Sequence, residues 1–507
     1  MVSEVDPDDA RPSQVSPSDL SSLVGHLAGV GVTPRTPHGV NADVTGMALD
    51  SRRVRPGDLY AAIPGAQVHG IAHLTAALTS GAVAVLTDEE GAAGVPAEVP
   101  VIVVPRPRPV LGSLAAEIYG RPAESLRMIG VTGTQGKTTT TRLLENGLTG
   151  AGIPAAVIGT VGTRVLGIEV ASALTTPEAP DLHGLLALMV ERGVEACAME
   201  VSSHALVQGR VDCIVFDVAV FLNLGRDHLD FHRDMDDYFA AKASLFTPAR
   251  ARSGLVNVDS DWGRRLLARP DIPLQSMSIV GHAADWCAFD IASSATGSRF
   301  RVVGPGTTEV GAGCPIPGGF NVANTLAAVA AAATAGYDAA AVARAIAGSE
   351  GVPGRLERID EGQEFQVVVD YAHKPDAIEA ALATLRPLTD GRLIVVLGAG
   401  GDRDAGKRPL MGRIAAAGCD VLVVTDDNPR SEDPAAIRAA ILEGTHDARA
   451  LVVEIGDRRA AIAEAIARAG AGDVVLVAGK GHETGQEIAG VVHPFDDRAV
   501  VREELRR

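Results

Sequence analysis

Gly130-Val131-Thr132-Gly133-Thr134-Gln135-Gly136-Lys137-Thr138-Thr139-Thr140 is the stretch that decides the fold of this chain. The apolar run 128–131 leads into it, and the segment 142–148 after it carries leucines at helical spacing. A strand, a glycine-rich turn and a helix in this order direct backbone N–H groups and the helix dipole at an anion. A lysine followed by a hydroxyl side chain suits phosphate oxygens and Mg²⁺. The stretch therefore predicts an ATP phosphate-binding loop.

One position departs from the usual form of this loop. The pattern places its first glycine where this chain has Val131, and the nearest glycines are Gly130 and Gly133. A short Gly-x-x-Gly-Lys-Thr turn also occurs as an ordinary surface loop. The choice between the two interpretations depends on the motifs that follow along the chain.

The composition of the 507 residues is that of a globular protein, with 46% apolar and 21% charged side chains. A formal net charge of −18 opposes binding to nucleic acid, and 3% aromatic residues leave few rings for base stacking. Five scattered cysteines without a Cys-x-x-Cys pair indicate small buried residues in a reducing compartment. Because no apolar run is long enough for a membrane span or signal peptide, we expect a cytoplasmic protein without a membrane partner.

The length indicates about three domains of ordinary size. We predict a disordered tail over residues 1–18, a small N-terminal α/β domain over 19–124, a central P-loop domain over 125–351 and a C-terminal domain over 352–507. Fully apolar strands that alternate with helices indicate parallel sheets buried on both faces. The predicted fold class is α/β, with a parallel sheet in the central domain and a Rossmann-like, doubly wound sheet in the C-terminal domain.

Polar residues follow the expected strands at the ends where parallel sheets bind ligands. Thr138, Glu200 and His228 form a set of ligands for Mg²⁺ near the triphosphate, since Mg²⁺ prefers oxygen donors and keeps water and phosphate oxygens. A capping role for Glu200 and a hydrogen-bonded loop position for His228 are the alternatives. His204 and His232 lie four residues after Glu200 and His228, which raises a zinc site, but no third donor stands at ligand spacing.

Lys242 lies on an expected amphipathic helix, 238–246, among aromatic residues. A solvated surface lysine is the ordinary interpretation of this position. Aromatic side chains that partly desolvate a lysine lower its pKa, and the neutral amine reacts with CO₂. The resulting carbamate is an anionic oxygen ligand that could bind a metal ion.

Three mixed-charge segments, 402–404, 426–430 and 479–483, follow expected strands of the third domain. Guanidinium groups hold carboxylates, and Asp and Glu hold ammonium groups, so these segments suit a zwitterionic small molecule. A surface ion-pair network is the alternative. The glycines of 398–401 resemble a dinucleotide fingerprint, but its third glycine would fall on Arg403, and the nicotinamide interpretation is weak.

Four motifs taken together resemble the Mur ligase family of ATP-dependent amide-forming enzymes. They are Thr132-Gly133-Thr134-x-Gly136-Lys137-Thr138, Glu200-Val201-Ser202-Ser203-His204, Asn223-Leu224-x-Arg226-Asp227-His228-Leu229-Asp230 and Asp370-Tyr371-Ala372-His373-Lys374-Pro375-Asp376. Three further boxes narrow the resemblance to the member that adds meso-2,6-diaminopimelate to UDP-N-acetylmuramoyl-L-alanyl-D-glutamate in peptidoglycan synthesis. They are Leu49-Asp50-Ser51-Arg52, Thr175-Thr176-Pro177 and Asp427-Asn428-Pro429-Arg430.

Carried over position by position, this resemblance implies three binding sites and a catalytic set. ATP would be bound by Thr132, Gly133, Thr134, Gln135, Gly136, Lys137, Thr138, Asn321, Asn324, Arg355 and Asp370. The UDP-muramoyl-dipeptide would be bound by Leu49, Ser51, Ala66, Gln67, Val68, Thr175, Thr176, Ser202, Gln208 and Arg210. Diaminopimelate would be bound by Arg403, Asp427, Asn428, Pro429, Arg430, Gly479 and Glu483. The catalytic residues would be Lys137, Glu200, His228 and Lys242, and the metal ligands Thr138, Glu200, His228 and the Lys242 carbamate.

The implied reaction transfers the γ-phosphoryl group of ATP to the D-glutamate carboxylate, and the amine of diaminopimelate then attacks the acyl phosphate. Phosphorylation supplies the leaving group that a carboxylate lacks, and Lys137 with Mg²⁺ neutralises charge on the phosphates. We expect ATP and Mg²⁺ as cofactors and a monomeric protein. A lysine-adding relative, a P-loop phosphotransferase and a nucleotide-gated regulatory module are the alternatives.

Overall fold

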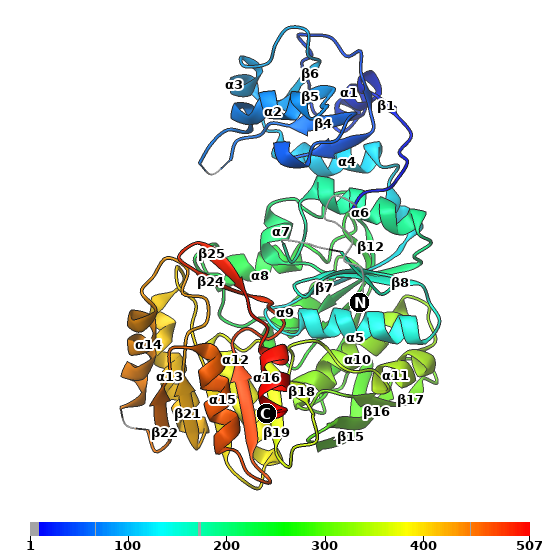
Figure 1. Ribbon diagram of the computed structural model, residues 1–507. Coiled ribbons are helices and arrows are strands. Elements are labelled where there is room, and N and C mark those ends of the chain that lie inside the picture. Colours follow the sequence, from blue (N-terminus) through cyan, green and yellow to red (C-terminus); the bar gives the residue numbers. More distant parts are fainter. Residues whose placement is uncertain (1–9, 66, 171–173, 447) are drawn as a thin grey trace. The chain divides into compact units, whose positions relative to one another are not determined.

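The structure of the protein is a computed structural model, which describes residues 10–65, 67–170, 174–446 and 448–507 (Figure 1). The chain divides into two compact units. The first comprises Met1–Cys287, Val303–Thr308 and Leu326–Ala345, and the second comprises Ala288–Val302, Glu309–Thr325 and Ile346–Arg507. Each unit is described by itself.

The N-terminal part of the first unit is a four-stranded parallel sheet in the order β3-β4-β5-β6. Its strands are β3 (Gly46–Ala48), β4 (Asp58–Ala61), β5 (Ala84–Thr87) and β6 (Val101–Val103), and its helices are α1 (Leu20–Gly29), α2 (Leu74–Thr79), α3 (Glu89–Ala92) and α4 (Leu111–Ile118). Residues of α1 and α4 pack with the sheet in one buried apolar cluster. A 3₁₀ turn (Gly70–His73) leads directly into α2.

The predicted disordered tail over residues 1–18 is wrong for the part of it that the structure describes, residues 10–18. The Arg11 guanidinium donates to both Asp58 carboxylate oxygens, at 2.9 and 2.7 Å, and to the Met47 carbonyl at 2.9 Å. The Ser13 N–H donates to Glu191 at 3.0 Å. A buried ion pair of this kind holds the segment in place, although its sequence is polar and rich in proline.

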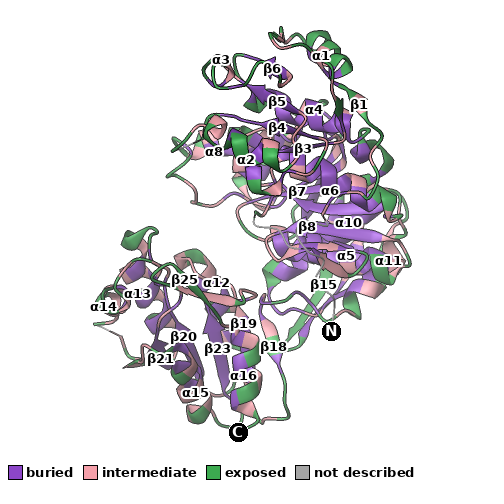
Figure 2. Ribbon diagram, turned by 45° about the horizontal axis from the view of Figure 1, so that its top comes forward, coloured by how far each residue is buried: buried purple, intermediate pink, exposed green. Residues whose placement is uncertain are grey.

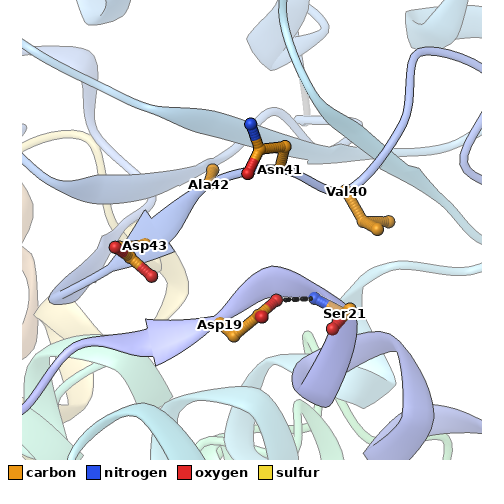
Figure 3. Close-up of a pocket in the computed structure, with 6 residues that line it drawn as sticks. All are labelled: Asp19, Ser21, Val40, Asn41, Ala42 and Asp43. Atoms are coloured by element: carbon orange, nitrogen blue, oxygen red, sulfur yellow. Dashed lines mark hydrogen bonds between the residues drawn. The ribbon is translucent and has the colours of Figure 1, made fainter.

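Strand β1 (Ser18–Asp19) follows this segment and pairs with β2 (Asp43–Val44) in a small antiparallel sheet. A surface pocket of about 470 Å³ lies beside this pair and is lined by Asp19, Ser21, Val40, Asn41, Ala42 and Asp43 (Figure 3). The Asp19 carboxylate accepts from the Ser21 N–H at 2.7 Å and caps α1. No residue predicted for a binding site lines this pocket.

The central part of the first unit is a larger sheet in the order β10-β9-β8-β11-β7-β12-β13-β14. Its strands are β7 (Arg127–Thr132), β8 (Ala155–Gly159), β9 (Gly162–Val165), β10 (Ile168–Val170), β11 (Ala196–Glu200), β12 (Phe216–Phe221), β13 (Ala251–Asn257) and β14 (Leu274–Ser278). Strands β8, β11, β7, β12, β13 and β14 are parallel neighbours, as their apolar runs predict. The helices of this part are α5 (Lys137–Gly150), α6 (Ala179–Glu191), α7 (Ser203–Val207), α8 (Met235–Ala243) and α9 (Asp261–Leu267).

The register of these strands brings distant loops to one edge of the sheet. Glu200 pairs with Val131, and Thr132 pairs with Phe221. Met199 pairs with Ile158 on the other side of β11. The loops after β7, β8, β11 and β12 therefore begin side by side, at the carboxyl edge where parallel sheets bind ligands.

The second unit contains a six-stranded sheet in the order β18-β19-β23-β20-β21-β22. Its strands are β18 (Glu357–Ile359), β19 (Gln366–Asp370), β20 (Leu393–Leu397), β21 (Val421–Val424), β22 (Leu451–Glu454) and β23 (Val474–Ala478), and its helices are α12 (Pro375–Leu385), α13 (Arg408–Gly418), α14 (Pro434–Leu442), α15 (Arg458–Arg468) and α16 (Asp497–Leu505). Strands β19, β23, β20 and β21 are parallel neighbours, as in the predicted doubly wound sheet. Strand β18 pairs antiparallel with β19, β22 pairs parallel with β21, and β24 (Gly485–Ile488) and β25 (Val491–Pro494) form a separate hairpin.

Three strands and two helices complete the description of the chain. Strands β15 (Trp286–Ser294), β16 (Gly297–Val303) and β17 (Glu309–Cys314) are neighbours in this order, and helices α10 (Gly319–Thr334) and α11 (Ala339–Ala347) follow them. Figure 2 shows that strands β7, β8, β19, β20 and β23 are largely buried. None of the described helices has the length and apolar character needed to cross a lipid bilayer.

The cysteines behave less uniformly than the sequence suggested. Cys197 and Cys314 are buried, as predicted. Cys213 is exposed, and Cys287 and Cys419 are half-buried, so the expectation of five buried thiols is wrong for these three positions. Cys213 lies in a turn after α7, outside any strand or helix, with a φ of 63°.

Candidate active site

The glycine-rich loop joins β7 to α5 as predicted. Gly136 has a φ of 85°, a left-handed conformation that glycine adopts without the strain of a β-carbon, and α5 begins at the next residue. The Lys137 ammonium folds back over the loop and donates to the carbonyls of Gly133 at 2.7 Å and Thr134 at 3.1 Å. The loop is therefore closed around its own lysine, at the start of a helix of fourteen residues.

Asn223 shapes this loop from the end of the neighbouring strand β12. Its side-chain carbonyl accepts from the N–H groups of Thr134 at 3.1 Å and Gln135 at 2.9 Å, and its amide donates to the Gln135 carbonyl at 3.1 Å. Asn223 was not among the predicted site residues. Its position in the Asn-Leu-x-Arg-Asp-His motif was the signal that could have identified it.

Glu200 ends β11 and is 1% exposed. Its carboxylate accepts from the Thr160 N–H at 2.8 Å and from the Thr160 hydroxyl at 3.2 Å. Its backbone carbonyl accepts from the Thr176 hydroxyl at 2.9 Å. The predicted metal ligand thus joins the turn after β8 to the segment that contains Thr175 and Thr176.

Lys242 is 1% exposed, so the surface-lysine interpretation is wrong. Its ammonium donates to the Gly133 carbonyl at 2.9 Å and lies 4.7 Å from the centre of the Tyr238 ring. Helix α8 places both residues beneath the glycine-rich loop, and the Tyr238 hydroxyl lies 3.1 Å from the Thr134 hydroxyl. The predicted catalytic residues Lys137 and Lys242 therefore share one backbone acceptor, Gly133.

The histidines of the two motifs gather into one aromatic cluster. The rings of His204 and His228 lie 4.8 Å apart, and those of His204 and Phe231 are stacked at 4.0 Å. His232 is buried and lies 2.9 Å from the Ser203 hydroxyl. Burial lowers the pKa of His204 and His232, which favours their neutral forms.

The donor chemistry beside the loop fits Mg²⁺ better than zinc. Among the described residues, no three His, Cys, Asp or Glu side chains gather into a metal-binding group. Thr138 in the first turn of α5 supplies a buried hydroxyl, and Glu200 supplies a buried carboxylate. These are hard oxygen donors, and Mg²⁺ completes such a shell with phosphate and water oxygens.

Three of the five predicted dipeptide-binding residues, Thr176, Ser202 and Arg210, are joined to one another by hydrogen bonds. The Arg210 guanidinium donates to the Thr176 carbonyl at 3.1 Å, and the Ser202 N–H donates to the Thr176 hydroxyl at 3.3 Å. Thr175 lies 3.0 Å from the Thr160 hydroxyl. Gln208 follows α7 and its N–H donates to the His204 carbonyl at 2.8 Å.

The predicted uridine-binding residues lie in the N-terminal sheet region. Ser51 is buried at the start of a 3₁₀ turn, and Leu49 before it is half-buried. Gln67 and Val68 are exposed, with 56% of Val68 accessible. Ala66 lies outside the described residues. An exposed apolar side chain of this kind is available to a ligand.

The remaining predicted nucleotide-binding residues belong to the second unit. Asn321 donates to the Pro317 carbonyl at 2.8 Å, and Asn324 donates to Asn321 at 3.1 Å. Burial raises the pKa of Asp370, while Arg355 and the N–H groups of neighbouring residues oppose this effect. Leu356 N–H donates to the Asp370 carboxylate at 2.7 Å.

The predicted amino-acid site lies at the carboxyl edge of the sheet in the second unit. Asp370, Leu397 and Val424 are aligned through Ala478, so the segments after all four strands begin at one level. Buried Lys480 donates to the Asn428 side-chain carbonyl at 2.9 Å and lies 3.5 Å from Glu483. The Asn428 amide donates to Glu483 at 2.9 Å.

The hairpin β24–β25 holds Arg430 at this edge. Arg430 has a φ of 52°, and its N–H donates to the Glu487 carbonyl at 2.9 Å while its carbonyl accepts from Ala489 at 2.7 Å. Its guanidinium donates to the Gly401 carbonyl at 2.5 Å and lies 3.3 Å from the Glu487 carboxylate. Arg403 is exposed on the loop after β20.

Arg458 supports this edge from the core and was not predicted. It is fully buried with Asp497, its guanidinium 2.7 Å from that carboxylate. It also donates to the carbonyls of Asp426 at 3.3 Å and Ala478 at 3.0 Å, which directly precede Asp427 and Gly479. Arg458 begins α15 and belongs to none of the motifs described above, so nothing in the sequence indicated this role.

Three profiles of one protein family match this chain in succession. The profile described as "Mur ligase family, catalytic domain" matches residues 43–119. The "Mur ligase middle domain" profile matches residues 131–332. The profile "Mur ligase, glutamate ligase domain" matches residues 354–481.

Individual proteins resemble the chain over nearly its whole length. UDP-N-acetylmuramoyl-L-alanyl-D-glutamate–2,6-diaminopimelate ligase of Streptomyces avermitilis is 53% identical over 507 residues and 99% of each chain is covered. A solved structure of a ligase of the same description is 36% identical with a TM-score of 0.65, covering 92% of this chain and 95% of that one. The MurF ligase of Thermotoga maritima, solved with ADP, has the same fold at 20% identity and a TM-score of 0.64, covering 91% and 96%.

Proposed function

This chain belongs to the Mur ligase family, and we propose that it adds meso-2,6-diaminopimelate to UDP-N-acetylmuramoyl-L-alanyl-D-glutamate at the expense of ATP. It is an amide-forming ligase with the three-domain α/β fold of that family. The observation that carries the proposal is the 53% identity to a diaminopimelate-adding ligase over 99% of both chains. The reaction serves peptidoglycan synthesis.

The first half of the proposed reaction is phosphoryl transfer to the D-glutamate carboxylate. Lys137 is the cation of the loop and holds developing charge on the transferred phosphoryl group. Thr138 and Glu200 would hold Mg²⁺, which neutralises phosphate charge when bound. Two contacts support this assignment. The Glu200 carboxylate accepts from Thr160, and the Glu200 backbone carbonyl accepts from Thr176, which is one of the proposed dipeptide-binding residues.

The second half is attack by the amine of diaminopimelate on the acyl phosphate. Arg403 and Arg430 would bind the carboxylate of the distal amino-acid centre, while Asp427 and Glu483 would bind its ammonium group. Asn428, Pro429 and Gly479 shape the same edge. Asn321, Asn324, Arg355 and Asp370 would support the nucleotide. Leu49, Ser51, Gln67, Val68 and Ala66 would bind the UDP end, and Thr175, Thr176, Ser202, Gln208 and Arg210 the dipeptide.

The test of this function is a comparison of amino acids at fixed ATP and UDP-muramoyl-dipeptide. We expect phosphate release with meso-2,6-diaminopimelate and a product whose mass contains one added diaminopimelate. Much slower release is expected with L-lysine or with no amino acid. Equal phosphate release without an amine, and no new amide, would contradict a ligase and favour a phosphotransferase.

The lysine-adding alternative depends on Arg430. Lysine lacks the distal carboxylate, so Arg430→Ala should raise KM for diaminopimelate and leave KM for ATP unchanged. The matched control is Arg413→Ala, which changes an arginine of α13 outside the proposed site. Equal turnover of lysine and diaminopimelate by the parent enzyme would favour the alternative.

We also propose that Lys242 carries a carbamate and that His228 lies beside the metal. Burial of Lys242 supports this, since loss of water disfavours the ammonium and so favours the neutral amine that reacts with CO₂. Lys242→Ala should lose activity, and short carboxylic acids should restore part of it. Failure of every carboxylic acid, together with an unmodified lysine in the mass spectrum of the intact protein, would overturn the proposal.

Three further features remain proposals. We propose domain boundaries at residues 19–124, 125–351 and 352–507, a monomeric state and a cytoplasmic location. Nucleotide-linked substrates support the location. Limited proteolysis would test the boundaries, and sedimentation equilibrium would test the monomer.

A further inference from the structure

Thr160 occupies a position that none of the proposed binding roles explains. It forms the turn between β8, which ends at Gly159, and β9, which begins at Gly162. Because β8 and β11 are parallel and Ile158 pairs with Met199, this turn begins beside Glu200. A residue that the sequence gives no reason to notice therefore lies against the buried carboxylate of the proposed active site.

The contacts of Thr160 form a directed chain of hydrogen bonds. Its N–H and hydroxyl approach separate oxygens of Glu200, at 2.8 and 3.2 Å, and its hydroxyl also lies 3.0 Å from that of Thr175. An ionised carboxylate only accepts, and a hydroxyl has one proton to donate. The Thr160 proton therefore goes to Glu200, and the Thr175 hydroxyl donates to Thr160.

Close contacts on both sides hold the turn that contains Thr160 in position. A β-carbon on Gly159 would lie 2.3 Å from the nearer Glu200 oxygen, so the strand end approaches the carboxylate as closely as glycine allows. On the other side, Arg142 donates to the Val161 carbonyl at 2.6 Å. Arg142 is 3% exposed and comes from α5, the helix that follows the phosphate-binding loop.

We propose that Thr160 is a positioning residue that couples the acceptor site to the nucleotide site. A ligand oxygen that takes the Thr175 proton ends its donation to Thr160 and changes the charge-assisted hydrogen bond on Glu200. Arg142 connects the same turn to the helix of the phosphate-binding loop. This inference rests on the proposed function, because Thr175 and Glu200 owe their roles to it.

The experiment compares Thr160→Val, Thr160→Ser and Thr163→Val. Valine keeps the shape of threonine without the hydroxyl, and serine restores the hydroxyl. Thr163 in β9 is a matched control, because its hydroxyl is buried and hydrogen-bonds none of the described residues. Calorimetry would measure the Kd of UDP-muramoyl-dipeptide with and without a non-hydrolysable ATP analogue and magnesium chloride.

In the parent and in Thr160→Ser, the analogue should change this Kd by about fivefold or more. In Thr160→Val the ratio should fall close to one, and kcat/KM should fall about tenfold, the usual scale for a hydrogen bond to a charged group. Thr163→Val should match the parent. If Thr160→Val only destabilised the fold, the fraction of binding-competent protein would fall, but the ratio of the two Kd values would stay at that of the parent.

Two results separate failure of this inference from failure of the proposed function. If the parent binds UDP-muramoyl-dipeptide and the ratio of Thr160→Val equals that of the parent, the coupling role is overturned. A parent ratio near one overturns it as well. If the parent binds no UDP-muramoyl-dipeptide at any nucleotide concentration, the proposed function itself fails.

Discussion

Removing the charge of Arg458 should destabilise the segments that carry the proposed amino-acid site, because Arg458 hydrogen-bonds the residues directly before Asp427 and Gly479. Arg458 and Asp497 are both fully buried, and the guanidinium lies 2.7 Å from the carboxylate. Burial by itself would lower the pKa of Arg458, but the nearby Asp497 carboxylate raises it above the ordinary value, so the pair is ionic. Arg458→Met would leave Asp497 as an unpaired buried charge.

The expected loss follows from this burial. Breaking a buried ion pair on one side costs about 3–5 kcal/mol, because the remaining charge has neither water nor a partner. The double variant Arg458→Met/Asp497→Leu removes both charges and should recover most of that loss. Its remaining defect should be in substrate binding, since the hydrogen bonds to the Asp426 and Ala478 carbonyls are also absent.

The assay must report on the second unit alone. The two tryptophans, Trp262 and Trp286, lie in the first unit, so their fluorescence does not follow this site. Hydrogen exchange measured by mass spectrometry gives local opening free energies, which should fall by about 3–5 kcal/mol in peptides covering β23 and α16. Peptides covering β7 should be unchanged.

Substrate kinetics provide a second measurement on the same variants. KM for diaminopimelate should rise in the double variant, and KM for ATP should stay near the parent value. The control is Arg459→Met, whose own side chain is 39% exposed, whose partner Glu503 is 55% exposed and whose other partner, Glu504, keeps a second ion pair with Arg507. An opening free energy in Arg458→Met within about 1 kcal/mol of the parent value would refute the reasoning, because an unpaired buried charge destabilises a protein by more than that.

Three further predictions concern the first unit. Gly159→Ala should lower kcat/KM at least about tenfold in a steady-state assay, because its β-carbon would lie 2.3 Å from a Glu200 oxygen; parent-like activity would contradict this. Arg11→Met should cost about 3 kcal/mol in urea unfolding followed by tryptophan fluorescence, since Asp58 would lose its buried partner, whereas a loss below 1 kcal/mol would mean the segment is not anchored. Burial lowers the pKa of His183 from 6.5 to about 4, so the unfolded chain binds the proton at a higher pH than the folded protein does. The free energy of unfolding should therefore fall by about 3 kcal/mol between pH 6.5 and pH 4. In His183→Gln, urea unfolding measured across this pH range should show a smaller fall.

The sequence by itself determined the parts of this protein whose signals are local. A glycine-rich turn between an apolar run and a helical repeat specified the phosphate-binding loop around Lys137. Uninterrupted apolar runs specified parallel strands, because such runs are stable only when helices cover both faces of the sheet. The mixed charges near Asp427 were correctly placed at strand ends of one sheet.

Only the tertiary structure decided which of these ends become neighbours and what supports them. Thr160 contacts Glu200, forty residues later in the chain, because β8 lies beside β11 in the sheet. No local sequence pattern predicts this strand order. Arg458 lies in an ordinary helix, and its partners Asp497 and Ala478 come from other elements. Arg11 was assigned to a loose tail because its buried partner, Asp58, is far away in sequence. In each case the polar side chain is stable in a buried position only because a residue distant in sequence is its partner, and local composition does not reveal that partner.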